Sequence, residues 1–250
     1  MKVLKFGGTS VGTVESLKAV LSIVKKSYDA KEKPLVVLSA MSGVTNLLTQ
    51  LAEDAAEGKS FSDGLKSLED KHFTVVKELL AVKYQNPVFT KLKLFFNEIE
   101  DLLQGIFALK ELSNQSKDLI LSYGERCSNY MVSKVMEQYI PESLFVDASH
   151  YVKTDSNFGN AHLNEMLTEQ LVKSLYITHR DKLLFVTGFI GSNENGRITT
   201  LGRGGSDYTA AIFGSILDAT AIEIWTDVNG MLTADPRIVK KAFSLPVFSY

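Results

Sequence analysis

Near the N-terminus, the spacing of apolar positions changes from continuous to helical and back. Residues 1–6 and 34–40 form short apolar segments with branched side chains, which is typical of buried strands. Between them, residues 14–28 place their apolar side chains on one face of a helix. A strand, a glycine turn, a helix and a second strand predict a parallel pair of strands joined by a right-handed crossover.

A long helical stretch follows the second strand, from about residue 44 to 138. Apolar residues recur there at three-to-four spacing in four segments: 44–58, 61–82, 88–109 and 116–139. We expect the charged side chains among them to form solvated faces, such as that of Lys66, Glu69, Asp70 and Lys71.

Strand patterns then return and alternate with helical ones. Strands are predicted within 143–148, 182–191 and 220–228, and helices within 160–175 and 206–217. This alternation favours an α/β protein. We predict a three-layer αβα sandwich with a mainly parallel sheet and a helical excursion after the second strand, forming one domain over 1–250.

Composition narrows the class of protein. The chain has 250 residues, 45% of them apolar, so it can bury a large core, and its net charge of −2 gives no general attraction to nucleic acid or acidic membranes. Cys127 is the single cysteine and the four histidines lack zinc-ligand spacing. No signal-peptide core or membrane-length apolar run occurs. We expect a cytoplasmic protein without a protein-held metal, and a Cys127 that packs in the core rather than acting in redox chemistry.

The segment "KFGGTS" is a candidate phosphate site. Lys5 lies at a predicted strand end, Gly7 and Gly8 can present backbone N–H groups, and Thr9 and Ser10 add hydroxyls. A tight strand-to-helix turn would explain the same residues. The segment is not a dinucleotide-binding fingerprint, and the P-loop-like "EGKS" at 57–60 lacks the first P-loop glycine.

The segment "LGRGGSDYTAA" is a second candidate anion site. Glycines around Arg203 allow close approach of the backbone, while Ser206 and Asp207 are favourable residues at a helix start. An ordinary glycine turn with a helix cap remains the alternative. Two such segments in one α/β domain suggest that two anions meet.

A third segment, "EIWTDVNGMLTADPR", follows the last predicted strand. It places Asp227 at the strand end, a turn over 228–231 and Arg237 after a proline. It could contact an adenine or a ribose, but the segment by itself favours a strand, a hairpin turn and a chain exit.

Five motifs, in this order and spacing, closely resemble aspartokinases of the amino-acid kinase family: "KFGGTSV", "VVLSAMSGVTN", "LSYGERCS", "TGFIGSNENGRITTLGRGGSDYTAA" and "EIWTDVNGMLTADPRIV". The match spans the chain and is nearest to the single-function lysine-pathway type. The resemblance implies that ATP phosphorylates the side-chain carboxylate of L-aspartate, giving 4-phospho-L-aspartate, the entry step to lysine, threonine and methionine. It also implies Mg²⁺ carried by ATP, a homodimer and the amino-acid kinase fold.

The resemblance assigns roles on the nucleotide side. Lys5 would stabilise the transferring phosphoryl group, Gly7 and Gly8 would donate N–H groups to phosphates, and Asp207 would orient Lys5 and the metal-bound phosphates. The other nucleotide contacts would come from Thr9, Ser10, Thr226, Asp227, Leu232 and Arg237. Leu232 stands where the family often has tyrosine, which leaves an adenine-stacking contact in question.

On the acceptor side, the resemblance implies that Glu125 takes the α-ammonium of aspartate and that Arg203 clamps a carboxylate, for which a planar guanidinium is suited. The remaining pocket residues would be Ser39, Thr45, Gly204, Gly205 and Ser206. An aspartate carboxylate is already ionised at pH 7, so the reaction needs no general base.

The family comparison also sets domain expectations. The chain is expected to hold an incomplete catalytic domain, with its nucleotide-binding half at about 183–250 and without regulatory domains. The alternatives are another amino-acid kinase, acting on glutamate, acetylglutamate, carbamate or UMP, and a fragment that binds aspartate without catalysis. A nicotinamide dehydrogenase is disfavoured because its fingerprint is absent.

Overall fold

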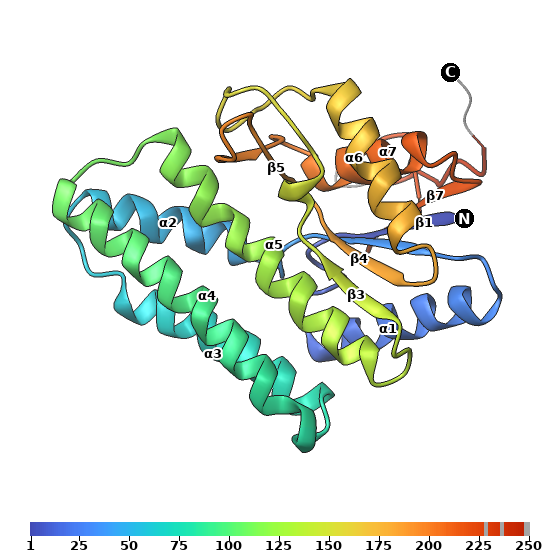
Figure 1. Cartoon of the computed structure of the whole chain (residues 1–250), viewed down its shortest axis with the longest axis horizontal. Coiled ribbons are helices and arrows are strands. Elements are labelled where there is room, and N and C mark those ends of the chain that lie inside the picture. The colour runs from blue at the N-terminus through green and yellow to red at the C-terminus, as the bar shows by residue number, and fades with distance from the viewer. Residues whose placement is uncertain (228–229, 236–237, 248–250) are drawn as a thin grey trace.

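The computed structural model describes residues 1–227, 230–235 and 238–247 and consists of a parallel sheet between layers of helices (Figure 1). The central sheet has the strand order β3-β4-β2-β1-β7, with every pair of neighbours parallel. The elements are β1 (Lys2–Phe6), α1 (Val14–Asp29), β2 (Leu35–Leu38), α2 (Val44–Ala56), α3 (Ser62–Leu79), α4 (Val82–Leu109), α5 (Asn114–Glu137), β3 (Ser143–Val146), the short 3₁₀ helix η1 (Ala148–His150), α6 (Glu165–Thr178), β4 (Leu183–Thr187), β5 (Ile190–Ser192), β6 (Ile198–Thr200), α7 (Gly205–Ile216) and β7 (Ala221–Trp225).

The strands β1, β2 and β4 are buried on both faces because they alternate apolar side chains between two cores, whereas the edge strand β7 is largely exposed. Leu4 and Phe6 face the core shared with α1 and with α2 to α5. Val3 and Val37 face the other core, which α6 and α7 cover. The α/β class and the mainly parallel sheet are therefore confirmed, as is the parallel pairing of β1 with β2 around α1.

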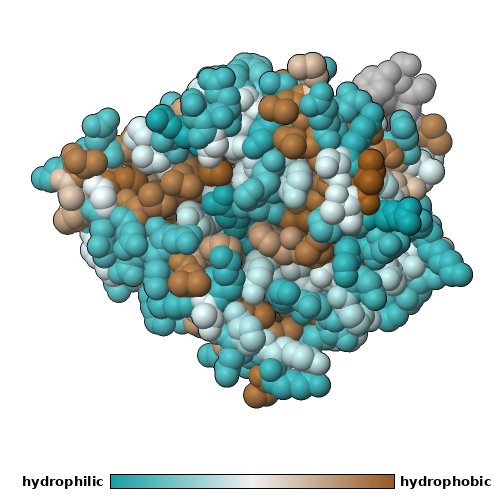
Figure 2. Space-filling model, in the orientation of Figure 1, coloured by the Kyte–Doolittle hydropathy of each residue, from teal (hydrophilic) through white to brown (hydrophobic). Residues whose placement is uncertain are grey.

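The helical excursion is also confirmed, as the four helices α2 to α5. In Figure 1, α2, α3 and α4 extend to one side of the sheet, and α5 runs back from them to β3. Figure 2 shows this face of the molecule as hydrophilic residues with apolar areas between them, the largest near the left end of the excursion. Within the described residues, no helix combines the length and the apolar character needed to cross a bilayer.

Three local predictions were wrong. The strand expected over 182–191 is broken at Gly188 and Phe189, where Phe189 has a φ of 69°, and β5 instead pairs antiparallel with β6. Helix α7 begins at Gly205 with Gly204 as its N-cap and no side-chain cap, so Ser206 lies inside the helix. Glu69, expected on a solvated face, is buried, and its charge is paired with that of Lys93 on α4 at 3.0 Å.

Candidate functional site

A cavity of about 510 Å³ lies at the carboxyl ends of β1 and β2, where ligands bind in sheets of this kind. The turn after β1, the loop after β2, helix α5 and the glycine loop before α7 all contribute to its wall. It brings together all the residues predicted to hold a substrate and both predicted catalytic residues: Lys5, Ser39, Thr45, Glu125, Arg203, Gly204, Gly205, Ser206 and Asp207.

Lys5 and Asp207 form an ion pair in this cavity, with 2.7 Å between Nζ and Oδ1. Lys5 projects from β1 toward the α7 face and is only 8% exposed, whereas the side chain of Asp207 is 52% exposed. Asp207 lies in the first turn of α7, where the helix dipole favours a negative charge. Lys5 thus has a fixed position and can turn its remaining N–H donors toward an anion.

The turn after β1 and the loop after β2 lie against each other. The N–H of Ser42 donates to the carbonyl of Gly8 at 3.0 Å, and that of Ser39 donates to the carbonyl of Phe6 at 3.2 Å. A Cβ on Gly8 would lie 3.0 Å from the carbonyl oxygen of Ala40, so glycine permits this approach. The close contact places Gly8 and Ser39 on the same cavity wall.

Glu125 supplies a buried carboxylate from α5 and is 3% exposed. Its Oε1 accepts a hydrogen bond from the N–H of Ala40 at 3.2 Å, while its Oε2 has no partner among the described residues. Burial raises the pKa of this carboxyl to about 8. A cation entering the cavity would supply the missing partner and favour the ionised carboxylate.

The neighbouring residues on α5 fix Glu125 against the end of β2. Asn129 donates from Nδ2 to the carbonyl of Leu38 at 3.0 Å and to that of Glu125 at 2.9 Å. Cys127 is buried, as expected for core packing, and burial raises the pKa of its thiol, so it is a poor nucleophile.

The glycine loop brings Arg203 to the cavity between two left-handed residues, Gly202 (φ 74°) and Gly204 (φ 75°). The N–H of Gly205 donates to the carbonyl of Gly202 at 3.0 Å and closes the turn. Arg203 is exposed and makes no ion pair with another described residue. Because the first N–H groups of α7 also have no partner inside the helix, this loop offers several donors to an anion.

The predicted nucleotide residues are more scattered. Of the members of that set that the structure describes, Lys5 and Gly8 line the cavity; Gly7 lies beside Lys5, where a Cβ would be 3.5 Å from its Nζ. Thr9 is exposed, and Ser10 donates to the carbonyl of Trp225 at 3.5 Å, which puts this turn beside the end of β7.

Beyond β7, Thr226 and Asp227 follow directly and their side chains share a hydrogen bond of 3.0 Å. Leu232 forms a β-bridge with Ser244 and is not among the residues that line the cavity. Arg237 and part of the turn predicted over 228–231 lie outside the described residues.

Sequence reasoning missed several residues of the cavity wall, among them Met41, Asn46 and Phe189. Phe189 looked like part of a continuous strand, and its left-handed backbone gives no signal in the sequence. The motif "SAMSGVTN" could have indicated Asn46, since it spans the whole loop.

The cavity offers few ligands for a protein-held metal centre. No group of three or more His, Cys, Asp and Glu side chains gathers in the part of the chain that the structure describes. Asp207 contributes a single carboxylate at the cavity, which fits a cation that arrives with phosphate and water ligands better than one held by the protein alone.

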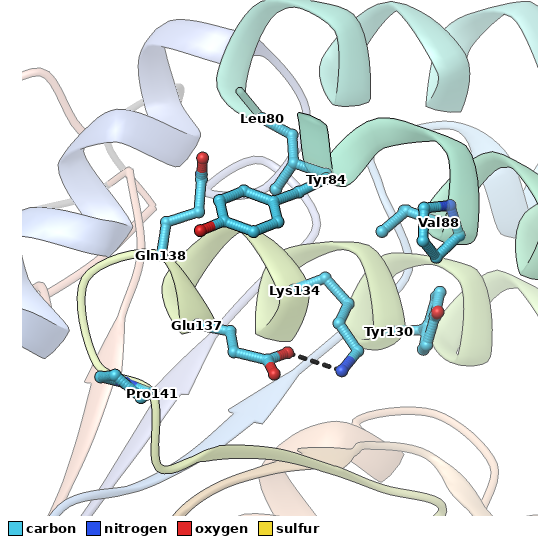
Figure 3. A pocket seen from close by; sticks show the side chains of 9 residues that line it. Leu80, Tyr84, Val88, Tyr130, Lys134, Glu137, Gln138 and Pro141 are labelled. Carbon is cyan, nitrogen blue, oxygen red and sulfur yellow. Dashed lines mark hydrogen bonds and ion pairs between the residues drawn. The ribbon is translucent and has the colours of Figure 1, made fainter. Parts of the chain in front are cut away.

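A second cavity, of about 500 Å³, lies between α4 and the C-terminal part of α5 (Figure 3). Tyr84 projects over it from α4, and Lys134 and Glu137 pair with each other on α5 at 2.6 Å. Because these two charges neutralise each other, this cavity has, among its described residues, no counterpart of the unpaired Arg203 guanidinium or of the unpartnered Glu125 oxygen. The first cavity is therefore the candidate functional site.

Comparison with known proteins identifies relatives over the whole chain. The model of the amino acid kinase family matches residues 1–250. The chain is 36% identical over 250 residues to the lysine-sensitive aspartokinase 3 of Escherichia coli K12, covering 96% of this chain and 52% of that protein. It is 34% identical to the chloroplastic aspartokinase 1 of Arabidopsis thaliana, covering 99% of this chain and 44% of that one.

Among solved structures, the chain superimposes on E. coli aspartokinase III in complex with aspartate and ADP with a TM-score of 0.89 and 32% identity. The match covers 98% of this chain and 53% of that one, so the chain spans about half the length of these relatives. Sequence motifs, family model and fold agree: the chain belongs to the amino acid kinase family, and the relatives it resembles within that family are aspartokinases.

Proposed function

We propose that this chain is the catalytic part of an aspartokinase, which transfers the γ-phosphoryl group of ATP to the side-chain carboxylate of L-aspartate. The observation that carries the proposal is that one cavity brings together a buried acidic side chain and two cationic side chains. A buried carboxylate with an unpartnered oxygen, Glu125, lies in the same wall as the cations Arg203 and Lys5. The solved relative with TM-score 0.89 contains aspartate and ADP, which supports the same pair of ligands here.

The acceptor half of the cavity suits an amino acid with two carboxylates. Glu125 binds the α-ammonium, which becomes the hydrogen-bond partner that Oε2 otherwise lacks. Arg203 binds the carboxylate that does not react, with its guanidinium as a bidentate donor. Ser39 and Thr45 border the substrate, and the second carboxylate then extends toward Lys5.

Catalysis in this arrangement comes from positioning and charge. The acceptor carboxylate is ionised at neutral pH and needs no base, but it must approach a polyanionic nucleotide. Lys5 stabilises the negative charge on the transferring group, and Asp207 keeps its ammonium in place at 2.7 Å. The N–H groups of Gly7 and Gly8 supply further donors to the phosphates.

Mg²⁺ bound to ATP would neutralise phosphate charge, and Asp207 is the cavity carboxylate available to face it or one of its waters. Thr9, Ser10, Thr226, Asp227, Leu232 and Arg237 remain the proposed nucleotide contacts. The proposal also includes a nucleotide-binding half at about 183–250, entry into lysine, threonine and methionine synthesis, a cytoplasmic location and a homodimer.

Calorimetry with L-aspartate and L-glutamate tests the acceptor site. We expect aspartate to bind with at least tenfold higher affinity than glutamate, because an added methylene displaces one charged end from Arg203 or Lys5. The variant Arg203→Ala serves as the matched negative control. Equal affinity for the two amino acids, or undiminished aspartate binding by the variant, would contradict the proposal.

A further inference from the structure

A second buried carboxylate, Asp118, lies on α5 seven residues before Glu125 and outside the cavity of the proposed active site. It is 2% exposed and accepts three hydrogen bonds. Its Oδ2 accepts from the backbone N–H of Gly159 at 2.9 Å and of Thr200 at 2.8 Å, and its Oδ1 accepts from the hydroxyl of Thr200 at 2.8 Å. One side chain therefore fastens α5 to two segments that follow it by 41 and 82 residues.

Burying a carboxylate at this position costs free energy. All three donors to Asp118 are neutral, and burial raises the pKa of its carboxyl despite those hydrogen bonds. An amide at this position could keep the two backbone bonds on its oxygen, but the Thr200 hydroxyl would have to change from donor to acceptor. Removing the side chain beyond Cβ would leave all three donors without their acceptor.

Thr200 is the last residue of β6 and directly precedes the loop that carries Arg203. That loop has little stiffness of its own, because Gly202 and Gly204 flank the arginine and both have positive φ. Arg203 makes no ion pair with another described side chain, so its place at the cavity depends on the backbone beneath it. The hydrogen bonds of Asp118 hold that backbone at its entry point, while the N–H of Leu201 donates to the carbonyl of Phe189 at 2.8 Å.

The second segment that Asp118 binds, the turn around Gly159, also contacts the glycine loop. Gly159 is followed by Asn160, whose Oδ1 occupies the space where a Cβ on Gly202 would lie. The N–H of Ala161 also donates to the carbonyl of Thr200 at 2.9 Å. The turn around Gly159 and the glycine loop thus form one unit with Asp118 as their common acceptor.

We propose that Asp118 is a positioning residue for the acceptor substrate: it holds the glycine loop so that Arg203 meets a carboxylate of the bound amino acid. This inference rests on the proposed function, since it takes aspartate as the ligand of Arg203. It predicts that weakening the Asp118–Thr200 contact lowers the affinity for aspartate and leaves the affinity for nucleotide unchanged.

The test compares Thr200→Val, which removes one hydrogen bond and keeps the two backbone donors, with Thr200→Ser, which retains the hydroxyl. Asp118→Ala is the stronger perturbation, because it removes the acceptor of all three hydrogen bonds. Glu137→Gln is the control on the same helix, because Glu137 is the last residue of α5 and pairs with Lys134. Circular dichroism and urea unfolding establish that each variant is folded.

Affinities for L-aspartate and for Mg-ADP are measured by calorimetry on each folded variant. We expect Thr200→Val to lose about tenfold in aspartate affinity, Asp118→Ala to lose more, and Thr200→Ser and Glu137→Gln to stay within about twofold of the original chain. Nucleotide affinity should stay within about twofold throughout. Undiminished aspartate affinity in Thr200→Val, or an equal loss for both ligands, would overturn the positioning role.

The original chain distinguishes this inference from the proposed function. Failure of the unaltered chain to bind aspartate would overturn both. Aspartate binding by the unaltered chain that survives equally in Thr200→Val would overturn the role of Asp118 alone.

Discussion

Replacing Glu125 by glutamine should make the stability of the fold less dependent on pH and abolish binding of the acceptor. In the folded chain the pKa of Glu125 is about 8, against an ordinary value of 4.5, because the carboxylate is buried with one oxygen unpartnered. The folded state therefore holds this proton more tightly than the unfolded state. The contribution to stability is fully present below pH 4.5 and is lost as pH rises from 4.5 to about 8.

The size of this loss follows from the two pKa values. One pKa unit corresponds to about 1.4 kcal/mol. Between pH 4.5 and 8 Glu125 ionises in the unfolded chain but stays protonated in the folded chain, which lowers the free energy of unfolding by about 1 kcal/mol at pH 5 and about 3 kcal/mol at pH 7. Glutamine cannot ionise and avoids the loss. Its amide nitrogen remains buried without a partner, which costs about 1–3 kcal/mol at every pH. The stability difference between variant and original chain should thus shift by about 2 kcal/mol in favour of Glu125→Gln from pH 5 to pH 7.

Urea unfolding at pH 5, 6, 7 and 8 measures this shift. Glu137→Gln is the matched control: Glu137 is on the same helix, but its side chain is 41% exposed and pairs with Lys134. Its variant shows what loss of a surface glutamate does to the same helix. In parallel, calorimetry at pH 8 should show at least a hundredfold loss of aspartate affinity in Glu125→Gln and none in Glu137→Gln.

Two outcomes would overturn these expectations. A stability difference for Glu125→Gln that does not change with pH would mean that the carboxyl is not held protonated by burial. Unchanged aspartate affinity in the same variant would mean that Glu125 does not bind the ammonium group.

Further variants separate the other roles. In the original chain, aspartate affinity should fall about tenfold for each pH unit below 8, because Glu125 must ionise to bind an ammonium; a flat profile by calorimetry from pH 6 to 8 would contradict this. Arg203→Ala should raise the aspartate KM with a smaller effect on kcat, and an unchanged KM would remove it from the pocket. Lys5→Ala should lower kcat about a hundredfold or more with less effect on KM, measured with saturating Mg-ATP. Gly202→Ala should lower the free energy of unfolding by about 1–2 kcal/mol in urea, because φ is 74° and a Cβ meets Asn160; unchanged stability would show that this position does not need glycine.

The periodic parts of the chain were predictable because they depend on local patterns. The apolar stripe of residues 14–28 became α1, and the three-to-four spacing over 44–138 became α2 to α5. The acceptor residues Ser39, Thr45, Glu125 and Arg203 came from the resemblance to aspartokinases. The structure brings them together in one cavity, and their roles stay predictions.

The remaining features depend on contacts between distant segments. The break after β4 occurs where a Cβ on Gly188 would lie 2.6 Å from Ser206 Oγ, so the approach of α7 sets it and not the apolar run itself. Glu69 and Asp118 look like surface charges in a helical pattern, yet both are buried. Lys93 pairs with Glu69, and Thr200 donates a hydrogen bond to Asp118. A charged residue reveals such a role only when its partner from another segment is known.

The most direct test of the proposed reaction is a hydroxylamine trap for acyl phosphate, run on this chain with Mg-ATP and either L-aspartate or L-glutamate. Hydroxylamine converts an acyl phosphate into a hydroxamate, so the assay reports transfer to a carboxylate. We predict hydroxamate with aspartate, none with glutamate, and loss of the signal in Lys5→Ala. No hydroxamate from a chain that binds both aspartate and Mg-ATP, or an equal yield with glutamate, would contradict the proposed reaction.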